Sequence, residues 1–359
     1  MSLYTNIIKP VLFRQDPENV HNRVTRLGAL FGKSALARGV LRSMFYFRHH
    51  ALELDVAGIE FDNPIGLAAG FDKNAKLYDV LPEIGFGFAE LGSVTGEICA
   101  GNPKPRLFRI PQEKSIIVNY GLCNDGCELI AKRLENVQFK IPIGFSVART
   151  NNPSYTIEEG IQDYRKAFLR MHTLGMYTTI NISCPNTPDG QAFGDLVNLT
   201  ALLKALAKEK HIKPIFLKIK PDYIESELRE IVDVVEKHDW LTGFVLTNLT
   251  NHRDGLKTSK EELDAISPKG CLSGLPAKER SNETLKQAHK LTDKVLIGCG
   301  GVFTGKDAYE KLKLGASLIQ LVTALIYEGP GVVSRINQEL VDLLQKDGFG
   351  SVKEAIAKH

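Results

Sequence analysis

The feature that most constrains the fold is an alternation of short apolar runs with longer amphipathic segments, which begins near residue 60. Eight apolar runs have the length of strands, and they cover residues 64–69, 87–92, 141–147, 177–182, 214–219, 243–247, 294–299 and 317–322. The segments that follow them place apolar residues three or four apart, as amphipathic helices do. Eight such units predict an α/β fold, a parallel (β/α)8 TIM barrel. A doubly wound open sheet is the alternative, but the chain has no early GxGxxG turn to support it.

The first fifty residues have a different composition from the rest of the chain. Ile, Leu, Val, Phe and Met recur there at helical spacing among Arg and Lys, with few acidic residues. This pattern is typical of a helix that lies on an anionic membrane, and it is equally compatible with a helical cap packed on its own domain. Pro10 is expected to break a first short helix, and Asp16 and Pro17 to be the N-cap and first residue of the next. We divide the chain into an N-terminal helical segment, 1–50, and a barrel, 51–359.

The overall composition argues against several classes of function. A net charge of +3 is too small to indicate a nucleic-acid partner, and no apolar run is long enough to span a bilayer. Six cysteines are scattered without a CxxC pair, and no secretory leader is evident, so we expect a reduced cytosolic compartment. Cys123 and Cys127 lack a second Cys/His cluster to complete four ligands, and we predict no metal.

Two connections are longer than a barrel requires. Residues 51–61 are expected to form a small β-ribbon that closes the bottom of the barrel. Residues 98–126 hold alternating runs, turn residues and Pro, which predict an antiparallel excursion over the catalytic mouth. Long ordered loops are usually functional.

Polar residues follow the predicted strands at the ends where a barrel builds its active site. Catalytic residues of this fold collect on the loops at the C-terminal ends of the strands. We expect one ring at one rim, formed by Gly70, Lys73, Ser93, Thr95, Arg149, Asn151, Asn181, Cys184, Asn186, Lys218, Lys220, Thr247, Asn248, the GCGG run at 298–301 and Thr323.

The GCGG run predicts an anion site. Backbone amides exposed by glycine and the dipole of the following helix both favour negative charge, and barrels often bind phosphate after strands seven and eight. Lys218 alternates with Ile219 in a predicted strand, so its side chain is expected to point into the barrel. There it can hold negative charge on a bound cofactor or a substrate carboxylate. A structural turn and a structural salt bridge are the respective alternatives.

Cys184 is the candidate general base. A thiol has a reference pKa of about 8.5, which its surroundings can shift toward neutrality, so it can remove a proton where a serine would need a relay. Pro185 restricts the backbone of Cys184, while Asn181 and Asn186 offer paired amides to a planar heterocycle. A small buried cysteine is the alternative reading.

Nine short motifs occur along the chain in a specific order: GLAAGFDKN, ELGSVTGE, GNPKPRLFR, NISCPNTP, FLKIKPD, TNLT, CLSGLP, IGCGG and GASLIQLVTALIYEGP. In content and order they resemble dihydroorotate dehydrogenase. The N-terminal helical extension is similar to that of the membrane-associated class of this family, which reduces quinone.

The resemblance implies an FMN-bearing barrel that oxidises dihydroorotate to orotate in pyrimidine biosynthesis, as a peripheral membrane enzyme on the cytoplasmic side. A base removes a proton from C5 of dihydroorotate while hydride passes from C6 to the flavin. Cys184 takes the base position, and the helices form the mouth of a quinone tunnel. The residues that match FMN contacts are Ala69, Gly70, Lys73, Ser93, Asn181, Lys218, Thr247, Gly274, Gly301 and Thr323. Those that match substrate contacts are Lys73, Asn181, Asn186 and Asn248.

The chain departs from the family pattern at several of these sites. The quinone class generally carries serine as its base, whereas Cys184 is the residue of the soluble class. Val118 stands where an asparagine binds orotate, and Leu122 where an aromatic residue is usual. The remaining departures are Ser146 for an asparagine, Leu249 for a hydroxyl residue and Val322 for a tyrosine.

These departures keep other functions open. A paralogous FMN oxidoreductase could act on a less polar substrate admitted by Val118, Leu122 and Leu249. A non-enzymatic flavin-binding or membrane-surface protein is disfavoured by the retained Lys73 and Cys184. A tRNA-reducing flavin barrel would need a basic face and usually a further helical domain, for which the C-terminal part of the chain leaves no residues.

Overall fold

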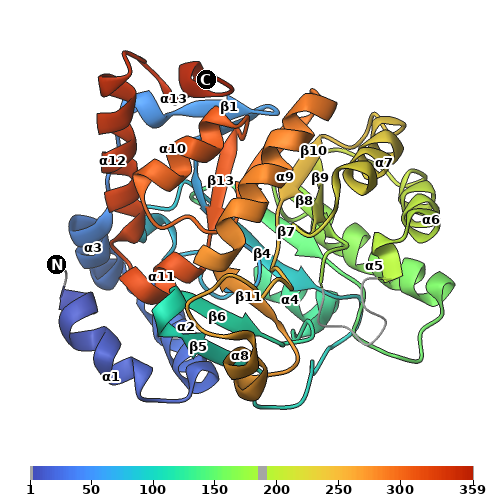
Figure 1. Ribbon diagram of the computed structural model, residues 1–359, viewed down its shortest axis with the longest axis horizontal. Helices are drawn as coiled ribbons and strands as arrows, with labels where there is room; N and C mark the ends of the chain where they lie inside the picture. Colours follow the sequence, from blue (N-terminus) through green and yellow to red (C-terminus); the bar gives the residue numbers. More distant parts are fainter. Residues whose placement is uncertain (1–2, 185–191, 359) are drawn as a thin grey trace.

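Eight parallel strands form a closed barrel at the centre of the computed structural model, which describes residues 3–184 and 192–358 (Figure 1). The strand order around the barrel is β10-β12-β13-β3-β4-β7-β8-β9. All eight predicted runs are confirmed as barrel strands. Their bounds are β3 Ile65–Leu67, β4 Phe88–Val94, β7 Ile143–Val147, β8 Tyr177–Asn181, β9 Ile215–Ile219, β10 Gly243–Leu246, β12 Val295–Cys299 and β13 Leu318–Leu321.

Helices surround the barrel after most strands. The longer ones are α4 Gly126–Leu134, α5 Ile157–His172, α6 Leu196–Leu206, α7 Glu225–Glu236, α9 Lys278–Leu291, α10 Gly305–Lys313 and α12 Val332–Lys346. Three shorter ones are α8 Lys260–Ile266, α11 Thr323–Glu328 and α13 Val352–Ala355.

The prediction of a helix after every strand is wrong for β3. Before β4 the chain forms only the 3-10 turn η3, Pro82–Ile84. The Asp72 carboxylate accepts hydrogen bonds from the backbone N–H groups of Lys76 and Leu77, which offers this segment a turn in place of a helix. The N-terminal helix α3, Ala35–Phe45, packs against η3 instead.

The N-terminal segment is helical up to Phe45. A π-helical turn, Tyr4–Ile8, runs directly into α1, Lys9–Phe13, and α2 covers Pro17–Lys33. The prediction of a break at Pro10 is therefore wrong: the backbone N–H of Lys9 donates to the Tyr4 carbonyl oxygen, and the helix continues through Pro10. The predicted cap is confirmed, since the Asp16 side chain accepts a 2.8 Å hydrogen bond from the backbone N–H of Asn19.

Both predicted excursions are confirmed as antiparallel strands. The ribbon consists of β1 Leu54–Val56 and β2 Ile59–Phe61, and the second excursion of β5 Leu107–Ile110 and β6 Ser115–Val118. Strand β11, Cys271–Gly274, adds to β6, and the sequence pattern did not predict it. Figure 1 shows β1 at the opposite end of the barrel from the β11-β6-β5 sheet.

Candidate active site

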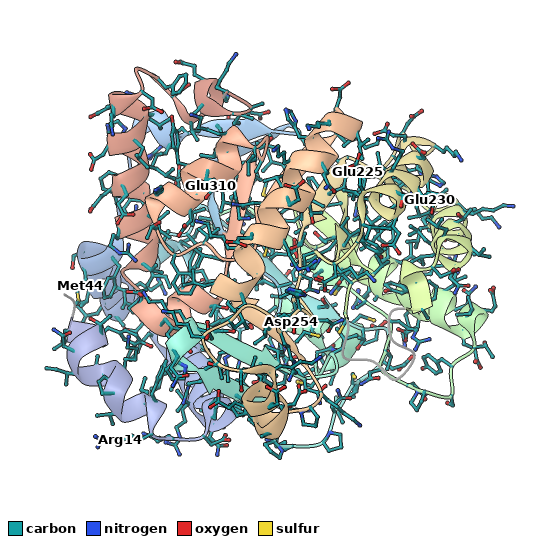
Figure 2. The ribbon with its side chains drawn as sticks, viewed as in Figure 1. Arg14, Met44, Glu225, Glu230, Asp254 and Glu310 are labelled. Atoms are coloured by element: carbon teal, nitrogen blue, oxygen red, sulfur yellow. The ribbon has the colours of Figure 1, made fainter. Side chains whose placement is uncertain are left out.

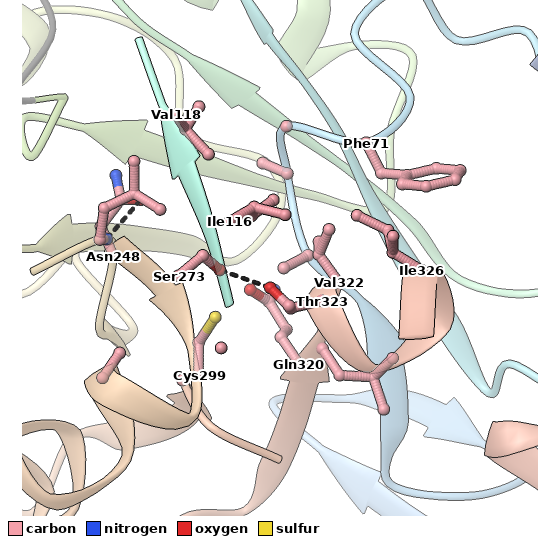
Figure 3. Close-up of a pocket in the computed structure, with 18 of the residues that line it drawn as sticks. Phe71, Ile116, Val118, Asn248, Ser273, Cys299, Gln320, Val322, Thr323 and Ile326 are labelled. Carbon is pink, nitrogen blue, oxygen red and sulfur yellow. Dashed lines mark hydrogen bonds between the residues drawn. The ribbon is translucent and has the colours of Figure 1, made fainter. Parts of the chain in front are cut away.

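A central cavity of about 150 Å³ lies between the C-terminal rim of the barrel and the β11-β6-β5 sheet. Its walls come from the loop after β3, from β6, from the turns after β12 and β13, and from β11. Figure 3 shows Ile116, Val118, Asn248 and Thr323 around it. The members of the predicted ring that line this cavity are Gly70, Lys73, Lys218, Asn248, residues 299–301 and Thr323, whereas Ser93, Thr95, Arg149, Asn151, Asn181, Cys184, Lys220 and Thr247 do not line it.

Two glycine turns and a pair of hydroxyl groups form one end of the central cavity. Gly274 and Gly301 have φ values of 91° and 70°, which favour glycine. An added Cβ would come within 2.3 Å of the Lys114 carbonyl oxygen at Gly274. Beside Gly274, the hydroxyl groups of Ser273 and Thr323 share a 2.6 Å hydrogen bond (Figure 3). Backbone N–H groups and hydroxyl groups in this arrangement suit an anion.

Gly70 lines another part of the central cavity. Its φ is 107°, and an added Cβ would meet no atom within 4 Å. Any other residue at position 70 would place its side chain in this open space, which glycine leaves free. Gly70 and Ala69 both line the central cavity.

Lys73 lies in the same wall and contacts two aromatic rings. Its Nζ is 3.3 Å from His21 Nε2 and 3.9 Å from the centre of the Tyr120 ring. Burial lowers the pKa of Lys73 from its usual value. Burial and the neighbouring Lys73 ammonium also lower the pKa of His21, to about 3, so that its imidazole is neutral at physiological pH. Cation–π contact compensates part of the desolvation of the ammonium.

A chain of hydrogen bonds joins several predicted residues beneath the cavity. Asn248 Nδ2 donates to Ser183 Oγ at 2.9 Å, and Ser183 Oγ donates to Asn181 Oδ1 at 2.8 Å. Asn181 Nδ2 then donates to Ser93 Oγ at 2.8 Å, and Ser93 shares a 2.7 Å bond with Ser146. Because β10, β8, β4 and β7 each contribute to it, this chain fixes the relative positions of the strand ends.

Lys218 points into the barrel, as predicted, and it is paired with a residue that sequence reasoning missed. Its Nζ lies 3.7 Å from Glu90 Oε1, and the side chains are 3% and 0% exposed. Glu90 Oε2 accepts hydrogen bonds from Thr179 and Gln320. Lys218 and Gln320 line the central cavity, so the ion pair lies directly beneath it.

Cys184 lies outside the lining of the central cavity. It is half-buried and lines a small neighbouring cavity together with Asn181, Arg149 and Tyr164. Asn181 thus connects the small cavity to the hydrogen-bond chain described above. Pro185 and Asn186 lie outside the described residues.

The predicted residues fall into three groups in the structure. Ser93, Asn181 and Thr247 are buried beside the central cavity, and Cys184 borders the adjoining small one. Those that line the central cavity are Ala69, Gly70, Lys73, Lys218, Asn248, Gly274, Gly301 and Thr323.

The departures from the family pattern also divide between the cavities. Val118, Leu249 and Val322 line the central cavity, and Leu122 lines the small one with Cys184. Ser146 is buried at the end of the hydrogen-bond chain. The apolar side chains therefore face space that a ligand would occupy.

Sequence reasoning missed Glu90, Ser183, Gln320, His21 and Tyr120. Glu90 carried a signal, since a carboxylate inside the apolar run 87–92 must find a buried partner. His21 and Tyr120 carried none, because they reach the cavity from α2 and from the segment after β6.

A second, apolar cavity lies beneath the N-terminal helices, and we call it the N-terminal cavity. It has a volume of about 410 Å³ and is lined by Leu12, Phe13, Val24 and Leu27 on the helical side. His21, Phe71, Leu107, Ile116 and Ile326 line both this cavity and the central one. The two cavities are therefore separated by one shared wall.

The described residues contain neither a membrane-spanning helix nor a cluster of metal ligands. In residues 3–184 and 192–358, no helix is long and apolar enough to cross a membrane. Over the same residues, no group of three or more His, Cys, Asp or Glu side chains could hold a metal ion.

The fold and the site define a (β/α)8 barrel whose C-terminal rim holds a cavity for a small molecule or cofactor. Residues 51–344 match the family model described as dihydroorotate dehydrogenase. The chain belongs to this family.

Similar proteins support the same assignment along the whole chain. A dihydroorotate dehydrogenase (quinone) from Christiangramia forsetii is 39% identical, over 95% of this chain and 99% of the relative. One from Gloeobacter violaceus is 39% identical, over 99% and 98%. Among solved structures, a dihydroorotate dehydrogenase from Eimeria tenella in complex with ferulenol has a TM-score of 0.82 at 30% identity, covering 95% of each chain.

Proposed function

We propose that this chain oxidises dihydroorotate to orotate in pyrimidine biosynthesis and passes the electrons to a quinone. The observation that carries this proposal is the shared wall between the central cavity, where Lys73, Lys218 and Asn248 stand among apolar side chains, and an apolar cavity beneath the N-terminal helices. Such a pair suits a polar substrate on one side and a lipophilic electron acceptor on the other. The names of the similar proteins point to the same reaction.

FMN is the cofactor that the central cavity fits best. The glycine turns at Gly274 and Gly301, with Thr323, would hold its phosphate, and the space left open at Gly70 would admit the ring system. The Lys218 ammonium would stabilise negative charge on the reduced ring. Bound there, FMN supplies the hydride acceptor that the reaction needs. Ala69, Ser93, Asn181 and Thr247 complete the proposed set of contacts.

The chain's own residues would bind the substrate and move its proton. Lys73 would pair with the carboxylate of dihydroorotate, and Asn181, Asn186 and Asn248 would hold its amide edges. The Cys184 thiolate would take the proton from C5 on the side of the small cavity. The hydrogen-bond chain from Asn248 to Ser93 would hold these groups at fixed positions relative to one another during the reaction.

We further propose that the N-terminal segment, 1–50, docks on the cytoplasmic side of a membrane and admits the quinone. Figure 2 shows Met44 at the left of the molecule and Arg14 below it at the lower left, both on the N-terminal helical segment. A segment that carries both basic and apolar side chains suits an anionic lipid surface. The exposed large apolar side chains of this segment are Leu3, Ile7, Ile8, Val11, Val24, Leu27, Leu30, Phe31, Leu36, Val40 and Met44.

Anaerobic mixing of the purified holoprotein with dihydroorotate tests the reaction. We expect the flavin absorbance to bleach within seconds and to return when a soluble quinone is added. A colourless protein would contradict the cofactor assignment. A yellow protein that dihydroorotate leaves oxidised would contradict the substrate assignment.

A second candidate function is oxidation of a less polar substrate by the same flavin barrel. It is favoured by Val118 and Leu249, whose apolar side chains line the central cavity. One unmade hydrogen bond to orotate would cost about 1 to 3 kcal/mol, or roughly 10- to 100-fold in affinity. Val118→Asn should therefore tighten orotate binding by that factor if orotate lies against this residue, and titration of the flavin spectrum with orotate measures it.

A further inference from the structure

The carboxylate of Glu90 is buried at the centre of the barrel, below the central cavity. It projects from β4 and has 0% of its side chain exposed. Its two oxygens have different surroundings. Oε2 accepts a 2.8 Å hydrogen bond from Thr179 Oγ1 and a 2.9 Å bond from Gln320 Nε2. Oε1 accepts no hydrogen bond from any residue that the structure describes.

The ammonium of Lys218 faces this free oxygen without bonding to it. The distance from Nζ to Oε1 is 3.7 Å, which is within ion-pair range and beyond a hydrogen bond. Thr179 and Gln320 hold the carboxylate from the other side, so it cannot approach Lys218 more closely without losing their bonds. Lys218 also lines the central cavity. The lysine therefore stands between a fixed negative charge and the space where a ligand would bind.

A buried charge at this position acts strongly on a cofactor. In the barrel interior the effective dielectric constant is far below that of water, so that a charge a few ångströms away shifts the stability of a reduced ring. Lys218 alone would favour a reduced, anionic ring, and the Glu90 carboxylate opposes part of that field. The net effect on the cofactor depends on both members of the pair.

We propose that Glu90 is a positioning residue that sets the reduction potential of the bound flavin by offsetting the charge of Lys218. This inference rests on the proposed function, because it requires FMN in the central cavity. It follows from the ion pair, the missing hydrogen bond on Oε1 and the position of Lys218 in the cavity wall.

Glu90→Gln tests the proposal by removing the charge while keeping the shape. We expect the two-electron midpoint potential of the bound FMN to become more positive by at least about 30 mV, which corresponds to about a tenfold change in equilibrium constant. Glu90→Asp keeps the charge but withdraws it by one methylene, and we expect a shift in the same direction that is smaller. Spectroelectrochemical titration of each holoprotein measures the potential without turnover.

A matched control separates the charge effect from a loss of packing. Glu83 is also a buried carboxylate, at 4% exposure, but it pairs with Lys140 and Arg42 beneath α3. Glu83→Gln should lower the stability and leave the potential unchanged. Equal potentials in Glu90→Gln and the unaltered protein, or equal shifts in Glu90→Gln and Glu90→Asp, would overturn the proposal. An unaltered protein without flavin would instead contradict the proposed function.

Discussion

The central cavity and the N-terminal cavity share a wall, and they are built in opposite ways. The central cavity is framed by strand ends that a buried hydrogen-bond chain holds in register, from Asn248 to Ser93. The N-terminal cavity is covered by an amphipathic helical layer whose polar contacts to the rest of the chain are separate pairs and not one connected chain. Among these, Arg109 donates to the carbonyl oxygens of Leu12 and Gln15, and Arg106 donates to Glu18.

This difference indicates that the reacting groups at the rim must be held at fixed distances, whereas the covering of the N-terminal cavity need not be. Proton and hydride transfer require atoms to be held at fixed distances, which a barrel rim provides. A lipophilic acceptor gains its affinity mainly from apolar burial and tolerates a more adaptable covering. Variants in the two regions should therefore affect different half-reactions. Variants at the rim should slow reduction of the flavin by dihydroorotate, and variants in the helical layer should slow its oxidation by quinone.

The largest effect is expected from Cys184→Ala. Loss of a general base typically costs 10²- to 10⁴-fold, so flavin reduction by dihydroorotate should slow by about that factor, while FMN stays bound. Oxidation of dithionite-reduced enzyme by quinone should keep its rate. Stopped-flow absorbance measures both steps, and Cys123→Ala, another half-buried thiol, is the matched control. An unchanged reduction rate would remove the thiol from the mechanism.

Arg109→Met should affect the other half-reaction. The guanidinium donates a 2.8 Å hydrogen bond to the Gln15 carbonyl oxygen and lies 4.5 Å from the Phe13 ring. Arg109 lines the N-terminal cavity, so loss of these contacts should loosen the helical cover, and we expect the KM for quinone to rise about tenfold, or about 1.4 kcal/mol in binding.

Reduction of a soluble dye with dihydroorotate as donor should be unaffected by Arg109→Met. Arg229→Met, on the exposed surface of α7, is the control. Equal losses with quinone and dye would show that the two regions are not separable in this way.

Glu18→Gln should lower the free energy of unfolding by about 1 to 3 kcal/mol, because Arg106 would lose its buried charged partner. The carboxylate is 8% exposed and lies 2.9 Å from Arg106. Chemical denaturation measures the loss. Glu53→Gln is the control, since Glu53 forms an exposed pair with Arg48, and solvent screens such pairs so that they contribute little to stability. Similar losses in both variants would contradict a special role for the α2 contact.

His21 should make the stability of the protein depend on pH. Its folded pKa of about 3 is below the usual 6.5, so the unfolded chain binds a proton that the folded chain does not. Its contribution to stability is therefore complete above pH 6.5 and declines as the pH falls toward 3. The slope is up to about 1.4 kcal/mol per pH unit. His21→Gln should flatten the stability profile in this window, and an unchanged profile would contradict the buried neutral imidazole.

The barrel could be predicted from the sequence because periodicity is a local property. Each apolar run of strand length, such as 214–219, specifies its own strand, and each strand end specifies which residues reach the rim. Strand β11 escaped prediction because Cys271–Gly274 is too short for periodicity and is defined by its pairing with β6. The segment after β3 escaped because the Asp72 carboxylate binds backbone N–H groups that a helix would otherwise use.

The sequence by itself therefore determined the barrel, the rim residues and the amphipathic character of the first fifty residues. Only the tertiary structure decided which side chains from distant segments meet: Glu90 with Lys218, Lys73 with His21 and Tyr120, and Arg106 with Glu18. The physical reason is that hydrophobic periodicity is fixed within a few residues along the chain. A buried charge, in contrast, is stabilised by whichever partner the closed barrel brings beside it.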